Sequence, residues 1–292
     1  MKNQIICVYG ASNTGKSTAL REMCRHLLAK GATDVYWQTP NGEDGLAKNE
    51  DIVVSMTYRG IRIGIQSHGD VGYGAVIQKQ LQCFKELGCE LILAASRTRG
   101  ATCDVIRSFC DDYEINWFST FAGRYIDKYC LWNDIEPTIE QLRQKKLTLL
   151  EQHLSKPVWK FGCRWNDQGT PDPHTKKLFK KYQVAFVYTS DVKQISKGDY
   201  LVLMDGLTSI AIGIVTSSPA SLVELTWSDN ERNGELKDYI DDSNVFGCRV
   251  QYFWLDEAER FSYEKLGMFC NAIQVTSKVN DLIYAKMKKA LQ

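Results

Sequence analysis

The sequence predicts an α/β protein whose first half forms a mainly parallel sheet with helices on both faces, and whose second half is β-rich. Three observations support this prediction. Strand and helix patterns alternate up to about residue 130, short strand patterns separated by turn dipeptides dominate from residue 158, and Pro157 marks the change between them. We therefore expect two domains, residues 1–155 and residues 156–292.

Hydrophobic periodicity defines the expected elements of the first half. Short apolar or β-branched runs predict strands, amphipathic runs predict helices, and Gly31 and Gly88 follow two of the helices as stop signals. The expected strands are 4–9, 34–38, 89–95 and 114–118, together with a hairpin over 51–66. The expected helices are 16–29, 76–87, 102–111 and 135–154, the last of which ends the first domain or connects it to the second.

Short strands characterise the second half. Gly-Asp at 198–199, Asp-Gly at 205–206 and Asn-Gly at 233–234 are turn dipeptides. The expected strands are 158–164, 183–188, 200–203, 209–216, 245–255 and 269–275, followed by a helix over 279–291. This number of short strands is typical of a small β-barrel or a strongly curved sheet.

Composition and charge narrow the class of protein. Of the 292 residues, 44% are hydrophobic and 24% are charged, as in ordinary globular chains, and the net charge of +1 gives no strong overall field for nucleic acid or membrane. The ten cysteines include no C-x-x-C pair, so we expect reduced core thiols, with a zinc site built from distant residues as the alternative. Neither a signal-peptide pattern nor a bilayer-spanning apolar stretch is present, which favours a cytoplasmic location and no membrane partner.

The strongest functional signal is Gly-Ala-Ser-Asn-Thr-Gly-Lys-Ser at residues 10–17. It matches G-x-x-x-x-G-K-[ST] and lies between a strand pattern and a helix pattern. Glycines let the backbone wrap closely around phosphate, and the loop N–H groups and the helix N-terminus point at the anion. Lys16 is expected to reach the β- and γ-phosphates and Ser17 to bind Mg²⁺. The expected nucleotide-binding residues are Gly10, Ser12, Asn13, Thr14, Gly15, Lys16, Ser17 and Thr18.

Through this motif, residues 1 to about 130 resemble the P-loop NTPase superfamily. The resemblance implies a three-layer α/β/α fold and the binding of a nucleoside triphosphate with Mg²⁺. No Asn-Lys-x-Asp guanine-recognition motif follows the strand at 89–95, so ATP is expected rather than GTP. The signature loop of ABC transporter ATPases is also missing.

A P-loop enzyme also needs an acidic residue after a second strand, where it holds the metal through water. The best candidate is Asp70, although three polar residues separate it from the apolar strand, unlike the family pattern. A turn aspartate that caps the next helix is the alternative interpretation. Glu43 and Asp44 are weaker candidates for the acid. His68 is either a group that positions water or phosphate, or a polar loop residue.

Two arginines follow the strand at 89–95. Arg97 and Arg99 lie where the carboxyl ends of sheet strands bind ligands in α/β folds, and a positioned arginine stabilises the charge of phosphoryl transfer. The alternative is that both are solvated loop charges. The expected catalytic set is therefore Lys16, Asp70, Arg97 and Arg99, and the expected metal-associated pair is Ser17 and Asp70.

The second half carries a weaker resemblance. Lys197-Gly198-Asp199, a strand, a turn and a second strand containing Gly213 are similar to barrels of the PUA, ASCH and EVE group, and to small sensing domains fused to restriction-type NTPases. The resemblance implies an architectural Gly-Asp turn and an aromatic cleft for a nucleobase, often modified or flipped. Aromatic residues are frequent here, and each can stack a base for roughly 1–3 kcal/mol or fill the core instead.

Three residues of the second half are candidates for a ligand site. Trp165 lies in a polar loop, where a buried ring is less expected than at the other aromatic positions. Lys176 and Lys177 belong to a basic cluster on an expected helix, which is either a contact for a phosphate backbone or a solvated face.

Three functions are compatible with these features. The first is an ATP hydrolase coupled to a domain that senses a nucleobase or nucleic acid, with antiviral or restriction-like defence as a setting suggested by analogy only. The second is a small-molecule kinase with Arg97, Arg99 and Arg107 as lid arginines, although no lid insertion or acceptor motif is evident. The third is a switch whose dimerisation depends on ATP without turnover. The sequence leaves self-association open.

Overall fold

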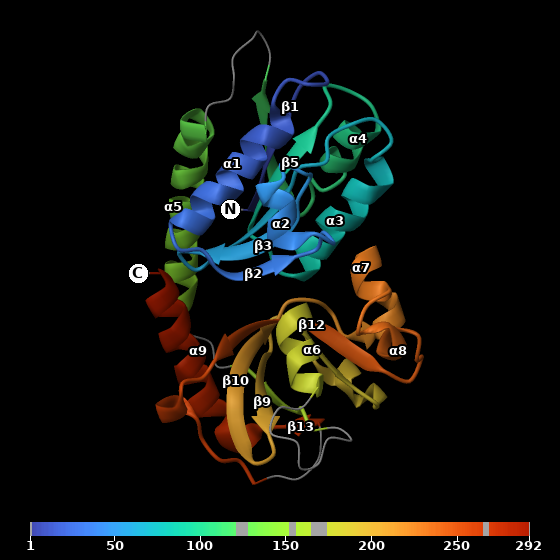
Figure 1. The fold of residues 1–292 in the computed structure, drawn as a ribbon. Helices are drawn as coiled ribbons and strands as arrows, with labels where there is room; N and C mark the ends of the chain where they lie inside the picture. The colour runs from blue at the N-terminus through green and yellow to red at the C-terminus, as the bar shows by residue number, and fades with distance from the viewer. Residues whose placement is uncertain (1, 121–127, 152–155, 165–173, 265–268, 292) are drawn as a thin grey trace. The chain divides into compact units, whose positions relative to one another are not determined.

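The protein is a mixed α/β chain with two sheets (Figure 1). The computed structural model describes residues 2–120, 128–151, 156–164, 174–264 and 269–291. The chain divides into two compact units, each with its own sheet. The first unit comprises Met1–Lys85, Cys89–Leu149 and Leu291–Gln292, and the second comprises Glu86–Gly88 and Leu150–Ala290.

The sheet of the first unit has six strands in the order β2-β3-β4-β5-β1-β6. Its strands are β1 (Asn3–Tyr9), β2 (Thr33–Trp37), β3 (Val53–Tyr58), β4 (Ile61–Gln66), β5 (Leu91–Ser96) and β6 (Tyr113–Ser119). Strands β4, β5, β1 and β6 are parallel, and β3 runs antiparallel to both of its neighbours. The expected hairpin is confirmed as β3 and β4, which turn at Arg59 and Gly60 with φ values of 48° and 73°.

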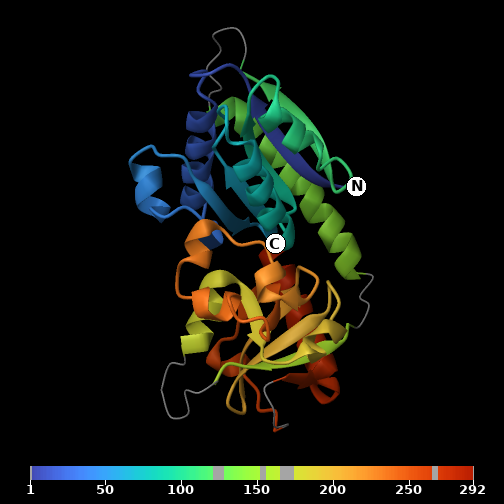
Figure 2. The ribbon, with the colours of Figure 1, turned by 90° about the vertical axis from the view of Figure 1, so that its right-hand side faces the viewer.

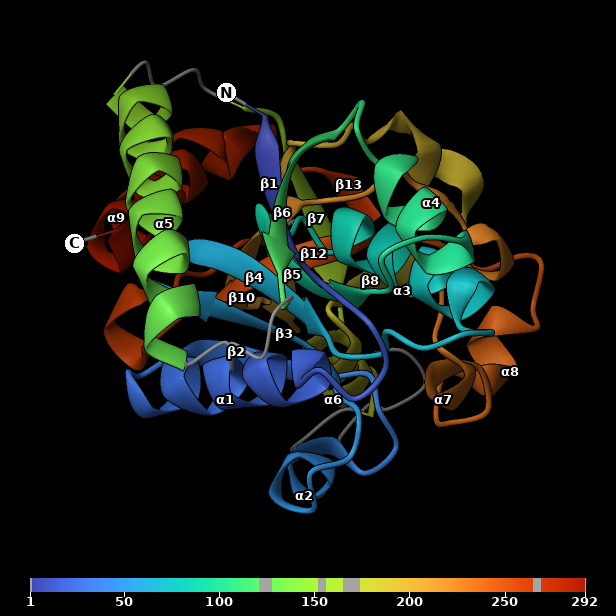
Figure 3. The same ribbon diagram turned by 90° about the horizontal axis from the view of Figure 1, so that it is seen from above.

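Helices cover both faces of this sheet. They are α1 (Lys16–Ala29), α2 (Gly42–Ala47), α3 (Gly74–Glu86), α4 (Ala101–Arg107) and α5 (Lys128–Glu151). Figure 3 shows α1 and α5 on one side of the strands and α3 and α4 on the other, and Figure 2 shows α5 as a single long helix. The buried residues of α1, including Leu20, Met23 and Leu27, recur at the three- and four-residue spacing that lays one helix face on a sheet.

The second unit contains a seven-stranded sheet in the order β11-β12-β10-β9-β7-β13, with β8 also paired to β12. Its strands are β7 (Val158–Gly162), β8 (Val184–Val187), β9 (Tyr200–Asp205), β10 (Thr208–Val215), β11 (Ala220–Ser221), β12 (Phe246–Trp254) and β13 (Phe269–Asn271). Its α-helices are α6 (His174–Tyr182), α7 (Asp229–Arg232), α8 (Lys237–Ile240) and α9 (Thr276–Leu291). Within the described residues these pairings do not close into a ring, so the resemblance to a PUA-type barrel stays a prediction.

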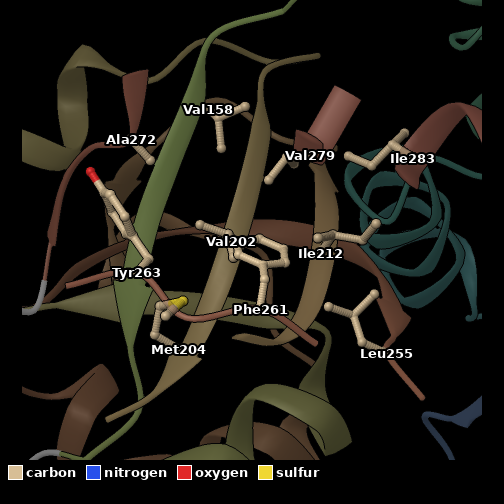
Figure 4. Packing of buried hydrophobic residues seen from close by; sticks show 10 residues of the cluster. All are labelled: Val158, Val202, Met204, Ile212, Leu255, Phe261, Tyr263, Ala272, Val279 and Ile283. Atoms are coloured by element: carbon tan, nitrogen blue, oxygen red, sulfur yellow. The ribbon is translucent and has the colours of Figure 1, made fainter. Parts of the chain in front are cut away.

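One face of this second sheet is covered by α9. Val279 and Ile283, one helical turn apart on α9, are fully buried against Val202 and Ile212 of β9 and β10 (Figure 4). Phe261 is a further buried member of the same cluster. Burying each such side chain contributes about 1.5–3 kcal/mol, so the unit has an apolar core of its own.

Asp199 ties the Gly-Asp turn to this sheet. Its Oδ2 accepts hydrogen bonds from the Trp159 Nε1 at 2.9 Å and from the Ser196 N–H at 2.9 Å, and the residue is 8% exposed. Both donors are satisfied by one carboxylate oxygen. This arrangement gives the Gly-Asp turn a structural role in the sheet.

The variant Asp199→Ala is expected to destabilise the second unit by about 1–3 kcal/mol for each buried donor left without a partner. Asp199→Asn, which keeps an oxygen at this position, is expected to lose less. Urea unfolding followed by tryptophan fluorescence measures both. An unchanged unfolding midpoint in Asp199→Ala would contradict the structural role of this carboxylate.

Two further properties concern the chain as a whole. Nine cysteines are free thiols within the described part, and burial raises the pKa of Cys24, Cys89, Cys163 and Cys248 to about 12, which suppresses the reactive thiolate.

Among the helices that the structure describes, none combines the length and apolar character needed to cross a membrane.

Candidate functional site: a phosphate-binding loop at the sheet edge

Four loops converge at one edge of the first sheet because the strands that precede them are parallel. The loop at residues 10–15 follows β1, residues 67–70 follow β4, Arg97 follows β5 and Thr120 follows β6. Ligands of open α/β sheets bind outside the carboxyl ends of the strands, so a ligand site is expected at this edge.

The backbone of the loop has the curvature that phosphate binding requires. Asn13 has a φ of 58° and Gly15, the N-cap of α1, has a φ of 85°, both in the left-handed region. No side chain caps α1 at Gly15. The first N–H groups of the helix therefore point at the loop with their partial positive charge, and an anion stabilises this arrangement.

Lys16 bends back over the loop. Its Nζ donates a 2.6 Å hydrogen bond to the carbonyl of Ala11, to which the Thr14 hydroxyl also donates at 2.9 Å. The residue is 5% exposed, and burial lowers the pKa of the Lys16 ammonium, while Asp70 raises it and Arg97 lowers it further. Lys16 is thus a partly desolvated cation within the concave face of the loop.

Ser17 connects the loop to the end of β4. Its hydroxyl donates to the carbonyl of Ser67 at 2.7 Å, and Ser12, Asn13 and Thr18 are exposed around it. The described residues contain no group of three or more His, Cys, Asp or Glu side chains arranged to hold a metal ion. A magnesium ion that also bonds to nucleotide phosphates needs few protein ligands, and a hydroxyl oxygen is of the kind Mg²⁺ prefers, so these residues fit the expected ion.

Asp70 and Arg97 form an ion pair at this edge, with Asp70 Oδ1 at 3.5 Å from Arg97 Nη1. The side chains are 64% and 27% exposed, so the pair contributes little to stability. Asp70 follows β4 and Arg97 follows β5, and the charge of each acts on the pKa of Lys16, which Asp70 raises and Arg97 lowers. Arg99 is exposed further along the same segment, and Arg107 pairs with Asp104 on α4.

Residue 10 must be glycine because the Thr120 side chain packs against its backbone. The Thr120 hydroxyl donates to Thr14 Oγ1 at 2.7 Å, and a Cβ built on Gly10 would lie 1.8 Å from Thr120 Oγ1. No side chain fits at residue 10 without displacing this contact. Thr120 thereby holds the middle of the loop from the neighbouring strand. No local sequence pattern identifies Thr120, because the pairing of β1 with β6 spans more than one hundred residues.

His68 lies on the segment between Ser67 and Gly69. Its ring stacks on Tyr73 with 5.1 Å between centroids, and its Nδ1 lies 3.4 Å from Gln80 Nε2. Burial lowers the pKa of His68, while Asp51 acts in the opposite direction. The neutral imidazole is therefore favoured, as either a donor or an acceptor near the loop.

Gly69 packs directly on Lys16. A Cβ at residue 69 would lie 2.9 Å from the Ala95 Cβ and 3.2 Å from Lys16 Cε. The backbone of Gly69 therefore fixes where the lysine stem can lie. The sequence signal that could have found this residue is the glycine between His68 and Asp70, immediately after an apolar strand.

The variant Gly69→Ala is expected to weaken nucleotide binding. The overpacking costs about 1–3 kcal/mol. If this cost falls on the lysine that binds the nucleotide, the dissociation constant for ATP rises roughly 5- to 150-fold. The matched control is Val71→Ala, which removes a side chain that is 77% exposed on the same segment and is expected to leave affinity unchanged. Equal affinities for the two variants would contradict the contact between Gly69 and Lys16.

The second unit places most of its aromatic residues in the core. Phe161, Phe186 and Trp227 are fully buried, whereas Tyr188 is 54% exposed. The buried rings cannot stack a base without local opening. Trp165, the aromatic residue that the sequence favoured for a ligand site, lies outside the described residues.

The basic cluster of the second unit lies on α6. Lys176 is half-buried and Lys177 is exposed. Their neighbours have local partners, because Lys180 lies over the Trp254 ring at 5.3 Å and Lys181 pairs with Glu235 at 2.9 Å. Part of the cluster is therefore engaged within the unit.

A shallow cavity of about 540 Å³ opens elsewhere on the first unit, between the end of α4 and β6. Lys2, Arg107 and Trp117 are among its lining residues, which include no residue of the loop at 10–17. The Lys2 ammonium is held by the carbonyl of Cys110 at 2.8 Å. This cavity is distinct from the candidate site at the loop of residues 10–17.

Comparison of the chain with models of known protein families, with curated proteins and with solved structures found no match.

Proposed function

We propose that this chain binds ATP with Mg²⁺ at the loop of residues 10–17 and hydrolyses it. One observation carries the proposal: the motif G-x-x-x-x-G-K-S lies between a buried parallel strand and an uncapped helix N-terminus, with a partly desolvated lysine inside the loop. Strand, loop and helix together form the context in which this motif binds phosphate.

Each nearby group has a role in this proposal. Lys16 neutralises charge on the β- and γ-phosphates, and Ser17 supplies an oxygen to the magnesium ion. Arg97, held by Asp70, compensates charge on the γ-phosphoryl group as water attacks phosphorus and the bond to the β-phosphate breaks, which gives ADP and phosphate. Arg99 is near enough in sequence to assist from the same segment.

The second unit is the sensing part of the proposal. It is a separate compact unit with its own core, and the basic helix α6 and the exposed Tyr188 are surfaces at which a nucleobase or nucleic acid could bind. This part of the proposal depends on the sequence resemblance to base-recognising barrels.

The test is ADP release from Mg-ATP by the purified protein, alone and with single-stranded DNA, duplex DNA, RNA and a panel of nucleosides. Basal turnover that rises with a nucleic acid supports the hydrolase coupled to a sensor. A phosphorylated nucleoside among the products would replace hydrolysis with kinase activity. ATP binding without turnover under any condition would contradict hydrolysis and favour the switch.

A further inference from the structure

A second acidic residue, which sequence analysis did not consider, adjoins the phosphate-binding edge. Asp51 immediately precedes the segment leading into β3, and β3 runs antiparallel to β4. The amino end of β3 therefore lies beside the carboxyl end of β4, and Val53 is paired with Gln66. The sequence pattern of P-loop enzymes places the metal-associated acid after a strand. Asp51 does not fit this pattern, because it precedes β3, which is antiparallel to β4.

Asp51 is linked to Ser17 through one residue. The Ser17 hydroxyl donates to the Ser67 carbonyl at 2.7 Å, and the Ser67 hydroxyl donates to Asp51 Oδ1 at 2.7 Å. The N–H of Ile52 donates to the same Ser67 hydroxyl at 2.8 Å, and Ser67 itself is fully buried. The position of Ser67, and through it that of Ser17, is fixed by hydrogen bonds at both ends.

Charge around Asp51 also suits a role at the site. Arg21 Nη1 lies 3.8 Å from Asp51 Oδ1, and Arg21 is on α1 one turn beyond Ser17. Both contacts of the carboxylate use Oδ1, and 38% of the side chain is exposed. Asp70 is likewise paired with an arginine, Arg97, but within the described structure it has no such link to Ser17: the Ser17 hydroxyl donates to Ser67, whose own hydroxyl donates to Asp51.

We infer that Asp51 is the acidic residue coupled to magnesium at this site. It orients Ser67 and Ser17, and when the ion is bound it would accept a hydrogen bond from a water of the ion's hydration shell. Mg²⁺ keeps several water ligands when it is bound through phosphates. A carboxylate that does not touch the ion can therefore contribute by hydrogen bonding to these waters and to the protein ligand of the ion. The inference rests on the proposed binding of Mg-ATP and assigns its metal-associated acid to Asp51 in place of Asp70.

The experiment measures ATP affinity by isothermal titration calorimetry in excess Mg²⁺ and in EDTA, for the full chain. The wild-type protein is expected to bind more tightly with Mg²⁺. In Asp51→Asn, the Mg²⁺-dependent gain in ATP affinity is expected to fall by about 10- to 100-fold, the range typical of residues that orient metal ligands. The ATP affinity of this variant in EDTA is expected to stay within about twofold of the wild-type value. Asp112→Asn is the matched control, because Asp112 has a similar exposure of 43% and is also paired with a basic residue, Lys85, and this variant is expected to keep the full gain.

The outcomes separate the inference from the proposed function. Absence of ATP binding by the wild-type protein would refute the proposed function, and the inference with it. If the wild type binds, a full Mg²⁺-dependent gain in Asp51→Asn would overturn the inference alone, as would equal losses with Mg²⁺ and in EDTA, which would show a purely structural role. Loss of the gain in Asp70→Asn but not in Asp51→Asn would return the role to Asp70.

Discussion

Replacing Lys16 by alanine is expected to weaken ATP binding roughly 10- to 150-fold and to remove ATP turnover. A hydrogen bond to a charged group is worth about 1.5–3 kcal/mol. In binding terms this is roughly 10- to 150-fold. The expected effect on turnover is larger because, in the proposed mechanism, Lys16 also neutralises charge that develops in phosphoryl transfer.

The fold is expected to survive this substitution. Lys16 is the first residue of α1 and alanine is the best helix former, so the helix gains rather than loses intrinsic propensity. The side-chain bond that disappears goes to the carbonyl of Ala11 in an exposed loop, where water can replace it. Thermal unfolding of the variant checks this point.

Lys30→Ala is the matched control for charge. Lys30 is an exposed lysine at the other end of α1, where its ammonium lies 5.3 Å from the Trp132 ring centroid. Its removal is expected to leave ATP affinity unchanged. If Lys16→Ala and Lys30→Ala bind ATP equally well, the loop at residues 10–17 is not the nucleotide site.

The second large effect is expected in the second unit, from Glu231→Ala. Arg249 and Glu231 form an ion pair at 3.2 Å whose side chains are 0% and 4% exposed. The guanidinium also donates to the carbonyls of Tyr182 at 2.8 Å and Thr226 at 2.6 Å, and lies 4.1 Å from the Trp227 ring centroid. Removing the carboxylate leaves a buried cation without its counter-charge, at a cost of about 3–5 kcal/mol.

Glu235→Ala provides the comparison for that result. Glu235 pairs with Lys181 at 2.9 Å, but both side chains are more than half exposed, so its loss is expected to cost less than about 1 kcal/mol. Native-state hydrogen exchange of the β12 amides measures the stability of this unit in each variant. Similar exchange rates in the two variants would contradict a stabilising role for the buried pair.

Local sequence signals predicted much of the first unit. The apolar run before Gly10, the glycine loop and the amphipathic spacing of α1 are each encoded within about thirty residues, and the structure places strand, loop and helix there. The hairpin was also predictable, because Arg59 and Gly60 separate two short β-rich runs. Propensity and periodicity suffice where an element depends on its own residues.

The remaining features depend on pairing between distant strands. Thr120 reaches Thr14 only because β6 pairs with β1, and Asp51 reaches Ser67 only because β3 is antiparallel to β4. The burial of Arg249 has no local signal either, since nothing in the residues of β12 indicates that this charged side chain points into the core. Strand order and register are not contained in a short window of sequence, so side chains that meet across the sheet were not identified.

The aromatic residues of the second unit illustrate a different limit. Their frequency suggested a base-binding cleft, but an aromatic side chain serves a core equally well. Trp227 and Phe186 are fully buried, and Trp159 is held by Asp199. Composition alone could not separate these two uses, because burial is decided by packing.

The central claim is that the loop at residues 10–17 holds the phosphates of a nucleoside triphosphate. The most direct test is calorimetric titration of the wild-type protein with ATP, ADP and AMP in the presence of Mg²⁺. The account predicts that ATP and ADP bind and that AMP binds at least about tenfold more weakly, because Lys16 and the N-terminus of α1 contact the β-phosphate that AMP lacks. Absence of ATP binding, or equal affinity for all three nucleotides, would contradict it.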